Sequence, residues 1–160
     1  MKRTITIRLN GTRRTADVEP NDILLDVLRE KLGVKSPKVG CERGDCGTCT
    51  ILLNEKSVRS CLILAVEADG CEIKTVEGLS KKGLTPLQKA FIRHNSFQCG
   101  FCAPGMVLSA TELLQKNPHP SGEEIKEHIS GNLCRCTGYT PIVEAIRDAS
   151  RVGKTRQRKR

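Results

Sequence analysis

Eight of the nine cysteines fall into two groups whose spacing suits metal binding. In the first group Cys41, Cys46 and Cys49 form a C-x4-C-x2-C run, and Cys61 follows twelve positions after the last of them. One loop would then supply three thiolates and a distant segment the fourth, which is a spacing that holds 2Fe-2S clusters. We therefore expect Cys41, Cys46, Cys49 and Cys61 to bind a 2Fe-2S cluster.

The residues around this run support a cluster over a zinc site. Three glycines accompany the cysteines: Gly40, Gly44 and Gly47. Glycine allows positive φ and lets backbone N–H groups approach sulfur, which stabilises the charge of a cluster. The alternative is a zinc ion held by four thiolates. Zinc sites usually pair two C-x2–4-C units instead of placing three cysteines in one glycine-rich loop, so the cluster is favoured.

The second group consists of Cys99 and Cys102, spaced C-x2-C, and of Cys134 and Cys136, spaced C-x-C. Each pair precedes a predicted helix, so two helix N-termini can direct their positive ends at an anionic cluster. Two distant cysteine pairs also occur in zinc modules. The C-x-C spacing is tight for a zinc unit, and we expect Cys99, Cys102, Cys134 and Cys136 to hold a second 2Fe-2S cluster.

The first group lies in a segment with strand periodicity, residues 1–77. Apolar residues alternate in 5–9, Asn10-Gly11 is typical of a type I′ hairpin turn, and 12–18 returns as a second strand. Residues 23–32 have helical spacing, with Asn21 or Asp22 as the N-cap and Gly33 as the stop. Further strands are predicted at 50–53, 58–62 and 72–76, the second of them containing Cys61. This pattern predicts a small β-rich domain.

The second group lies in a segment with helical periodicity, residues 78–150, after a linker near 77–84. Four helix starts are visible: Thr85-Pro86, Pro104-Gly105, Ser121 and Thr140-Pro141. The chain has one Tyr, three Phe and no Trp, so metal clusters would compensate for small cores that lack bulky side chains. The fold class is therefore α+β, with a β-rich domain followed by an all-α domain.

Charge and hydropathy define the remaining expectations. The formal charge is +9, and six positive charges with no acid lie in residues 151–160, which leaves +3 for residues 1–150. We expect 151–160 to be a disordered basic tail, with no aromatic residues to stack on nucleic acid. No signal peptide or membrane span is evident, so the cytoplasm is the expected compartment, where clustered cysteines bind metal more often than they form disulfides.

Three motifs resemble one family along the chain. They are Cys41-Glu-Arg-Gly-Asp-Cys46-Gly-Thr-Cys49-Thr50, Gln98-Cys99-Gly100-Phe101-Cys102-Ala103-Pro104-Gly105-Met106, and Gly131-Asn132-Leu133-Cys134-Arg135-Cys136-Thr137-Gly138-Tyr139. In this order they are similar to the small iron–sulfur subunit of the molybdenum hydroxylases, the family of xanthine dehydrogenase and carbon monoxide dehydrogenase. The resemblance covers residues 3 to about 150. Thr48, where Ala is common, Ala103, where Thr is common, and Cys71, without counterpart in the motifs, are its departures.

The resemblance implies a β-grasp, plant-type 2Fe-2S ferredoxin domain and a four-helix 2Fe-2S domain. It also implies that the cluster of the helical domain lies beside the pterin of a molybdenum cofactor, with Gln98 hydrogen-bonded to the pterin and Cys136 the nearest ligand. The other cluster would lie nearer FAD. Molybdenum cofactor and FAD would belong to a large subunit and a flavin subunit, in a heterotrimer that is single or doubled.

The expected function is electron transfer in a heteromeric molybdenum-containing oxidoreductase. The chain has no Ser/His/Asp set, phosphate loop or flavin-binding segment, so it has no catalytic residue or substrate site of its own. One alternative is a two-cluster ferredoxin that acts alone as a carrier. Another is a zinc-stabilised protein that binds nucleic acid through its basic tail, although we expect neither a nucleic acid nor a membrane partner.

Overall fold

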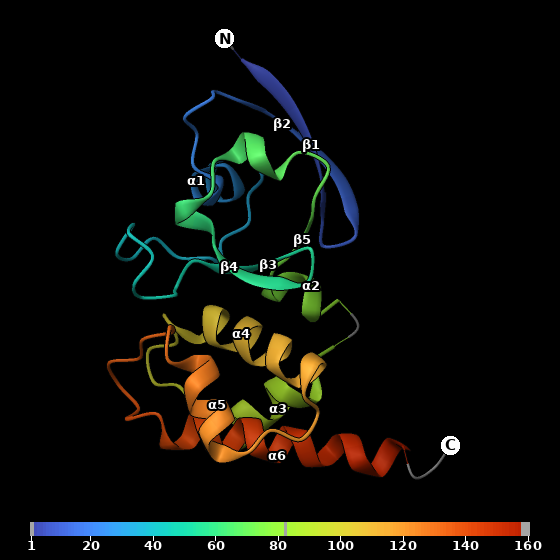
Figure 1. Ribbon diagram of the computed structural model, residues 1–160, viewed down its shortest axis with the longest axis vertical. Coiled ribbons are helices and arrows are strands. Elements are labelled where there is room, and N and C mark those ends of the chain that lie inside the picture. The colour runs from blue at the N-terminus through green and yellow to red at the C-terminus, as the bar shows by residue number, and fades with distance from the viewer. Residues whose placement is uncertain (1, 82, 158–160) are drawn as a thin grey trace.

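The computed structural model describes residues 2–81 and 83–157, and Figure 1 shows them as a sheet-containing half stacked on a helical half. The sheet has five strands in the order β2-β1-β5-β3-β4. Strands β1 (Arg3–Leu9) and β2 (Thr12–Val18) form the expected hairpin, with positive φ at Asn10 and Gly11. The sequence prediction of this hairpin is confirmed.

The other strands complete a mixed sheet. Strand β3 (Thr50–Leu53) pairs antiparallel with β4 (Lys56–Arg59) and with β5 (Glu72–Lys74), and β5 runs parallel to β1. The parallel β1–β5 pair requires a crossover, and the chain between β2 and β5 includes the expected helix. The sheet and this helix enclose a core that includes Ile5, Ile7, Leu24, Leu28, Ile51 and Ile73.

The helix in this crossover differs in detail from the prediction. It begins as α1 (Leu24–Asp26) and continues as a π-helical segment, Val27–Lys31. Its N-cap residue is Ile23, which makes no side-chain capping bond, so the predicted cap by Asn21 or Asp22 is wrong. The Asp22 carboxylate instead accepts hydrogen bonds from the Glu19 N–H and from Lys31.

The segment that carries Cys61 is also different from the prediction. Strand β4 ends at Arg59, and Ser60–Leu62 forms a 3₁₀ turn, so Cys61 lies just after the strand and not inside it. A second 3₁₀ turn, Ala65–Ala68, leads to β5. The turn matters because it directs the Cys61 side chain into the interior, where only 8% of the residue is exposed.

The helical half contains the four predicted helices and one short addition. The helices are α3 (Pro86–Arg93), α4 (Ala103–Lys116), α5 (Gly122–Ile129) and α6 (Thr140–Gln157). Thr85 and Ser121 form the capping boxes expected at α3 and α5. The short helix α2 (Val76–Leu79) occupies part of the expected linker. The core of this half includes Phe91, Met106, Ile125, Ile129, Ile142 and Ile146.

Helix α6 extends further than the sequence prediction allows. The prediction places a disordered tail over 151–160, whereas the backbone of residues 151–157 continues the helix. Arg, Lys and Gln have good helix propensity, and no proline interrupts the segment. Residues 158–160 of the predicted tail lie outside the described residues. Among the residues that are described, no helix is both long and apolar enough to cross a bilayer.

Candidate metal centres

The first cysteine group is brought together by the glycine-rich loop before β3 and by the 3₁₀ turn after β4. Cys49 and Cys61 are buried, and their Sγ atoms lie 3.4 Å apart. Cys41 and Cys46 are half-buried and form a second pair, linked by a hydrogen bond from the Cys46 N–H to Cys41 Sγ at 3.4 Å. The structure thus places all four predicted ligands in one region, as two adjacent pairs.

Backbone N–H groups of the loop point at these sulfur atoms. Hydrogen bonds from the N–H groups of Arg43 and Cys46 lower the pKa of the Cys41 thiol to about 6. Burial has the opposite effect on Cys61 and, together with the neighbouring Cys49, raises its pKa to about 11. Such N–H donors stabilise thiolates in iron–sulfur sites, because the negative charge of the cluster extends onto its sulfur atoms.

The second cysteine group lies where the loop before α4 meets the loop between α5 and α6. Cys99 and Cys136 are exposed, with Sγ atoms 3.8 Å apart. Cys102, the N-cap residue of α4, is buried and is hydrogen-bonded to Cys134. Burial and this neighbour raise the pKa of Cys102 to about 12. The four predicted ligands again form two pairs, one buried or half-buried and one open to solvent.

This arrangement in pairs is the one that a 2Fe-2S cluster requires of its ligands. A single zinc ion draws four thiolates into one tetrahedron. A 2Fe-2S cluster has two irons, and four cysteines divide between them as two pairs. The donor set and its pairing fit two 2Fe-2S clusters.

The loops that carry the two groups contact each other, on the same side of the molecule in Figure 1. The Leu133 N–H donates to the Cys46 carbonyl at 2.9 Å. The buried Asn132 side chain donates to the Gly47 carbonyl at 3.0 Å and to Thr50 Oγ1 at 3.2 Å. Arg59 donates to Thr50 Oγ1 at 2.7 Å and to the Gly131 carbonyl at 2.6 Å. These bonds fix one cysteine group relative to the other.

Sequence reasoning did not find these positioning residues. Asn132 was visible only as part of a cysteine motif, and Arg59 is an ordinary basic residue at the end of a strand. The bonds that join the two loops, from Arg59 to Gly131 and from Asn132 to Gly47, span 72 and 85 positions in the sequence. No local pattern indicates a contact over that separation.

Gln98, the predicted pterin contact, lies beside the second group. Its Nε2 donates to the Cys136 carbonyl at 3.0 Å, and its side chain is exposed. Gln98 therefore links the loop before α4 to the loop before α6. This bond holds the exposed Cys99 and Cys136 side by side.

Comparison with known proteins assigns both halves of the chain. Residues 7–80 match the family described as a 2Fe-2S iron-sulfur cluster binding domain, and residues 75–147 match a second 2Fe-2S binding domain family. The chain is 54% identical to the nicotine 6-hydroxylase small subunit of Paenarthrobacter nicotinovorans, over 91% of this chain and 88% of that protein. It is 49% identical to the nicotinate dehydrogenase small FeS subunit of Eubacterium barkeri, over 92% of this chain and 95% of that protein.

The chain belongs to the small iron–sulfur subunits of the molybdenum hydroxylases. The crystal structure of quinoline 2-oxidoreductase from Pseudomonas putida 86 contains a chain that this iron–sulfur subunit matches with a TM-score of 0.92 and 48% identity, over 96% of this chain and 97% of that one. The aldehyde oxidoreductase of Desulfovibrio gigas matches with a TM-score of 0.90 and 43% identity, over 96% of this subunit but only 17% of that longer chain. Electron transfer through two 2Fe-2S domains, as predicted, is confirmed.

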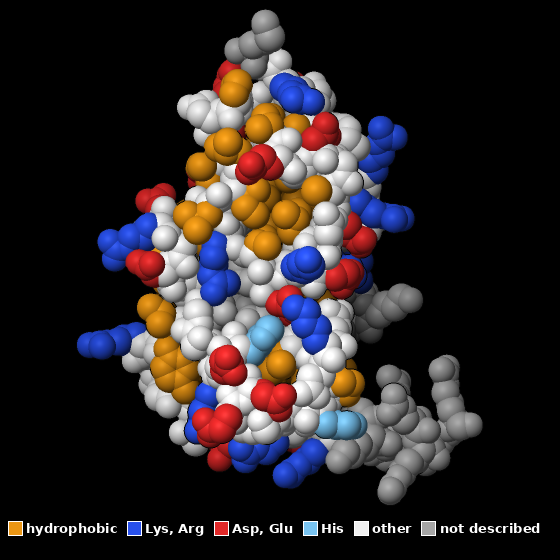
Figure 2. Space-filling view, in the orientation of Figure 1, with side chains coloured by type: hydrophobic (Ala, Val, Ile, Leu, Met, Phe, Trp, Pro, Cys, Tyr) orange, Lys and Arg blue, Asp and Glu red, His pale blue; other side chains and the backbone are white. Residues whose placement is uncertain are grey.

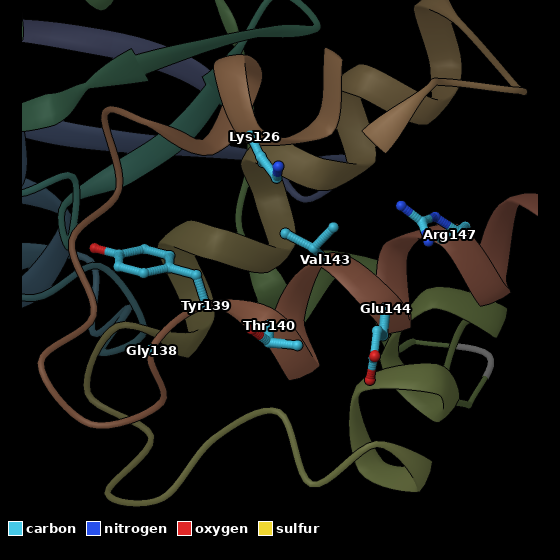
Figure 3. Close-up of a pocket in the computed structure, with 7 residues that line it drawn as sticks. All are labelled: Lys126, Gly138, Tyr139, Thr140, Val143, Glu144 and Arg147. Carbon is cyan, nitrogen blue, oxygen red and sulfur yellow. The ribbon is translucent and has the colours of Figure 1, made fainter. Parts of the chain in front are cut away.

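The iron–sulfur subunit also has a groove on its helical half, drawn in Figure 3. Lys126 of α5 and Val143 and Arg147 of α6 line it, and Tyr139 borders it at the start of α6. The hydroxyl of Tyr139 accepts a hydrogen bond from the Cys134 N–H at 2.9 Å, so this ring supports the second cysteine group from the groove side. None of the eight cysteines of the two groups lines the groove.

Proposed function

We propose that this chain relays single electrons between a molybdopterin site and FAD, both carried by partner subunits, through two 2Fe-2S clusters. The pairing of thiols at two joined sites is the observation that supports this proposal. When bound, a 2Fe-2S cluster accepts and releases one electron at a time. The chain itself supplies thiolate ligands, backbone N–H donors to sulfur and a rigid connection between the two sites.

The proposed ligands are the eight cysteines of the two groups. Cys41, Cys46, Cys49 and Cys61 would hold the N-terminal cluster. Cys99, Cys102, Cys134 and Cys136 would hold the C-terminal cluster. We place the boundary between the ferredoxin-like domain and the helical domain at residues 77 and 78, inside α2, where the two family matches overlap.

The exposed pair at the second site supports the proposed order of the clusters. Cys99 and Cys136 are exposed, and Phe101 and Leu133 nearby in sequence are 47% and 51% exposed. Exposed apolar residues around open ligands are typical of a surface that a partner covers. We propose that the molybdenum subunit covers it, with Gln98 and Cys136 facing the pterin. The N-terminal cluster would then face the flavin subunit, in a heterotrimer that is single or doubled.

Two features of the chain bear on its compartment and on nucleic acid. None of the nine cysteines is in a disulfide, which suits a reducing compartment, and we propose the cytoplasm. On the face in Figure 2, basic and acidic side chains are interspersed over both halves, without a broad surface of one sign. A nucleic-acid-binding face gathers positive charge, so this face does not favour such a partner.

Metal analysis of the full chain, purified without oxygen, tests the proposal. We expect about four iron and four sulfide per chain, the content of two 2Fe-2S clusters, and two distinct EPR signals after reduction. Cys99→Ser should remove one signal and Cys49→Ser the other, whereas Cys71→Ser, outside both groups, should leave both. Retention of both signals in either ligand variant would contradict the ligand assignment, and stoichiometric zinc would contradict the function.

A further inference from the structure

Thr48 contacts a proposed ligand sulfur of the N-terminal site. Its Oγ1 lies 3.3 Å from Cys46 Sγ, and the residue is only 5% exposed. The backbone fixes its place, because the Lys38 N–H donates to the Thr48 carbonyl at 3.0 Å. The hydroxyl is therefore held against the sulfur, away from bulk water.

Gly40 leaves the space that this contact occupies. A Cβ at position 40 would lie 2.7 Å from Thr48 Oγ1 and 2.9 Å from Cys46 Sγ, both closer than real Cβ contacts. Gly40 does not have positive φ, so its backbone conformation does not require glycine, contrary to the role that the sequence suggests for it. Glycine is required at position 40 for a steric reason, because a Cβ there would clash with Thr48 Oγ1 and Cys46 Sγ.

The direction of the hydrogen bond follows from the charge of the sulfur. Thr48 Oγ1 also lies 3.3 Å from the Lys38 carbonyl, so its single proton has two possible acceptors. A cysteine bound to iron is a thiolate, which carries no proton and is the stronger acceptor because hydrogen bonds to charged groups exceed neutral ones. With the cluster bound, the Thr48 hydroxyl donates to Cys46 Sγ.

We propose that the Thr48 hydroxyl raises the reduction potential of the N-terminal cluster by donating a hydrogen bond to Cys46 Sγ, in a space that Gly40 keeps open. Reduction adds one electron, and no bond forms or breaks. The added negative charge extends onto the ligand sulfurs, so a donor at Cys46 stabilises the reduced form more than the oxidised form. This inference rests on the proposed assignment of Cys46 as a ligand.

A similar contact at the C-terminal site provides a matched comparison. Thr137 Oγ1 donates to Cys134 Sγ at 3.2 Å and accepts the Tyr139 N–H at 3.2 Å. Its proton is therefore free for the sulfur. At each site a threonine hydroxyl contacts one proposed ligand sulfur. Either hydroxyl can be removed by substitution without altering the other site.

The test is an EPR-monitored redox titration of the full chain, with the C-terminal cluster as reference in the same sample. Thr48→Val keeps the shape of the side chain and removes the hydroxyl. We expect the equilibrium constant for reducing the N-terminal cluster to fall by up to about tenfold, because only the part of the hydrogen-bond energy that differs between the reduced and the oxidised cluster contributes. A tenfold change is about 59 mV for one electron. Thr48→Ser should restore the wild-type potential, and Thr137→Val should shift only the C-terminal cluster.

The outcomes separate this inference from the proposed function. If wild-type protein lacks the N-terminal EPR signal, both fail. If the signal is present but Thr48→Val does not shift its potential, or Thr48→Ser shifts it equally, only this inference fails. A second measurement uses wild-type protein: exchange into D2O should shift the iron–thiolate stretching bands of the N-terminal cluster in resonance Raman spectra. Absence of an isotope shift at that cluster would overturn the inference even if Thr48→Val loses its cluster.

Discussion

The backbone N–H of Leu133 donates a hydrogen bond to the carbonyl oxygen of Cys46, 2.9 Å away. Cys46 belongs to the first cysteine group, and Leu133 directly precedes Cys134 of the second. One hydrogen bond and a few covalent bonds therefore connect the two sites through the backbone. The side chains of Asn132 and Arg59 make further hydrogen bonds where the two halves meet. This contact between the halves therefore fixes the distance between the two sites.

Asn132→Ala should weaken this contact between the two halves. The Asn132 side chain is buried and donates to Gly47 and Thr50, so its removal leaves buried acceptors without that donor. We expect the free energy of unfolding to fall by about 1–3 kcal/mol, measured by urea denaturation. Gln115→Ala removes an exposed amide from α4 and should have little effect. Equal losses in the two variants would contradict the role of Asn132.

Gly105→Ala should destabilise the contact between the two halves, although alanine has the better helix propensity. A Cβ at Gly105 would lie 2.3 Å from the Gly47 backbone oxygen, which has no freedom to move aside. We expect a net destabilisation of about 1–3 kcal/mol, typical of overpacking, seen as a lower thermal midpoint.

Gly122→Ala is the matched control for this variant. A Cβ at Gly122 would meet only the guanidinium end of Arg147, at 2.6 Å, and that side chain can rotate away. The control should keep the wild-type midpoint. If Gly105→Ala does so as well, the close contact of α4 with the cysteine loop is not needed for stability.

Glu112 should make the contact between the halves sensitive to acid. Burial of the Glu112 carboxyl raises its pKa, but hydrogen bonds from Lys116 and Ser57 outweigh burial, so the pKa is lowered from its usual 4.5. Ser57 belongs to β4 and Glu112 to α4, so the bond crosses between the halves. A carboxyl with a lowered pKa stabilises the fold above its unfolded pKa, and this stability is lost as the pH falls through the folded pKa.

Glu112→Gln should therefore be less stable than wild type at pH 7, and the difference should shrink below pH 4.5, the usual value for glutamate. Urea denaturation at several pH values measures this difference. Glu123, which is exposed and paired with Lys126, provides the control, because surface ion pairs contribute little. A pH-independent gap between Glu112→Gln and wild type would show that the charge of Glu112 is not the cause.

Deletion of residues 151–160 should leave both clusters in place. The buried residues of α6 that are described include Ile142, Ile146 and Ala149, which the deletion leaves in place, and Arg151 is exposed. We expect unchanged iron and sulfide content and a nearly unchanged thermal midpoint. Loss of iron from the shortened chain would show that the end of α6 supports the C-terminal site.

The cysteine spacing, the Asn10-Gly11 turn and the caps at Thr85 and Ser121 determined much of this protein from sequence alone. They predicted the hairpin, two of the four helices and both proposed ligand groups, because each is encoded within a few residues. The local signals failed where a residue beyond the local segment, 9 or 12 positions away, made the contact. Asp22 binds Lys31 instead of capping α1, and Cys61 lies in a turn because the chain bends to bring it to Cys49.

Only the tertiary structure decided how the two sites are joined and how their sulfurs are contacted. The bonds from Leu133 to Cys46 and from Asn132 to Gly47 connect residues more than 80 positions apart. The space at Gly40 that admits the Thr48 hydroxyl also exists only in the folded loop. Contacts between distant segments form only when the chain folds and are not encoded in local spacing, so the sequence predicted the ligands and only the fold showed their surroundings.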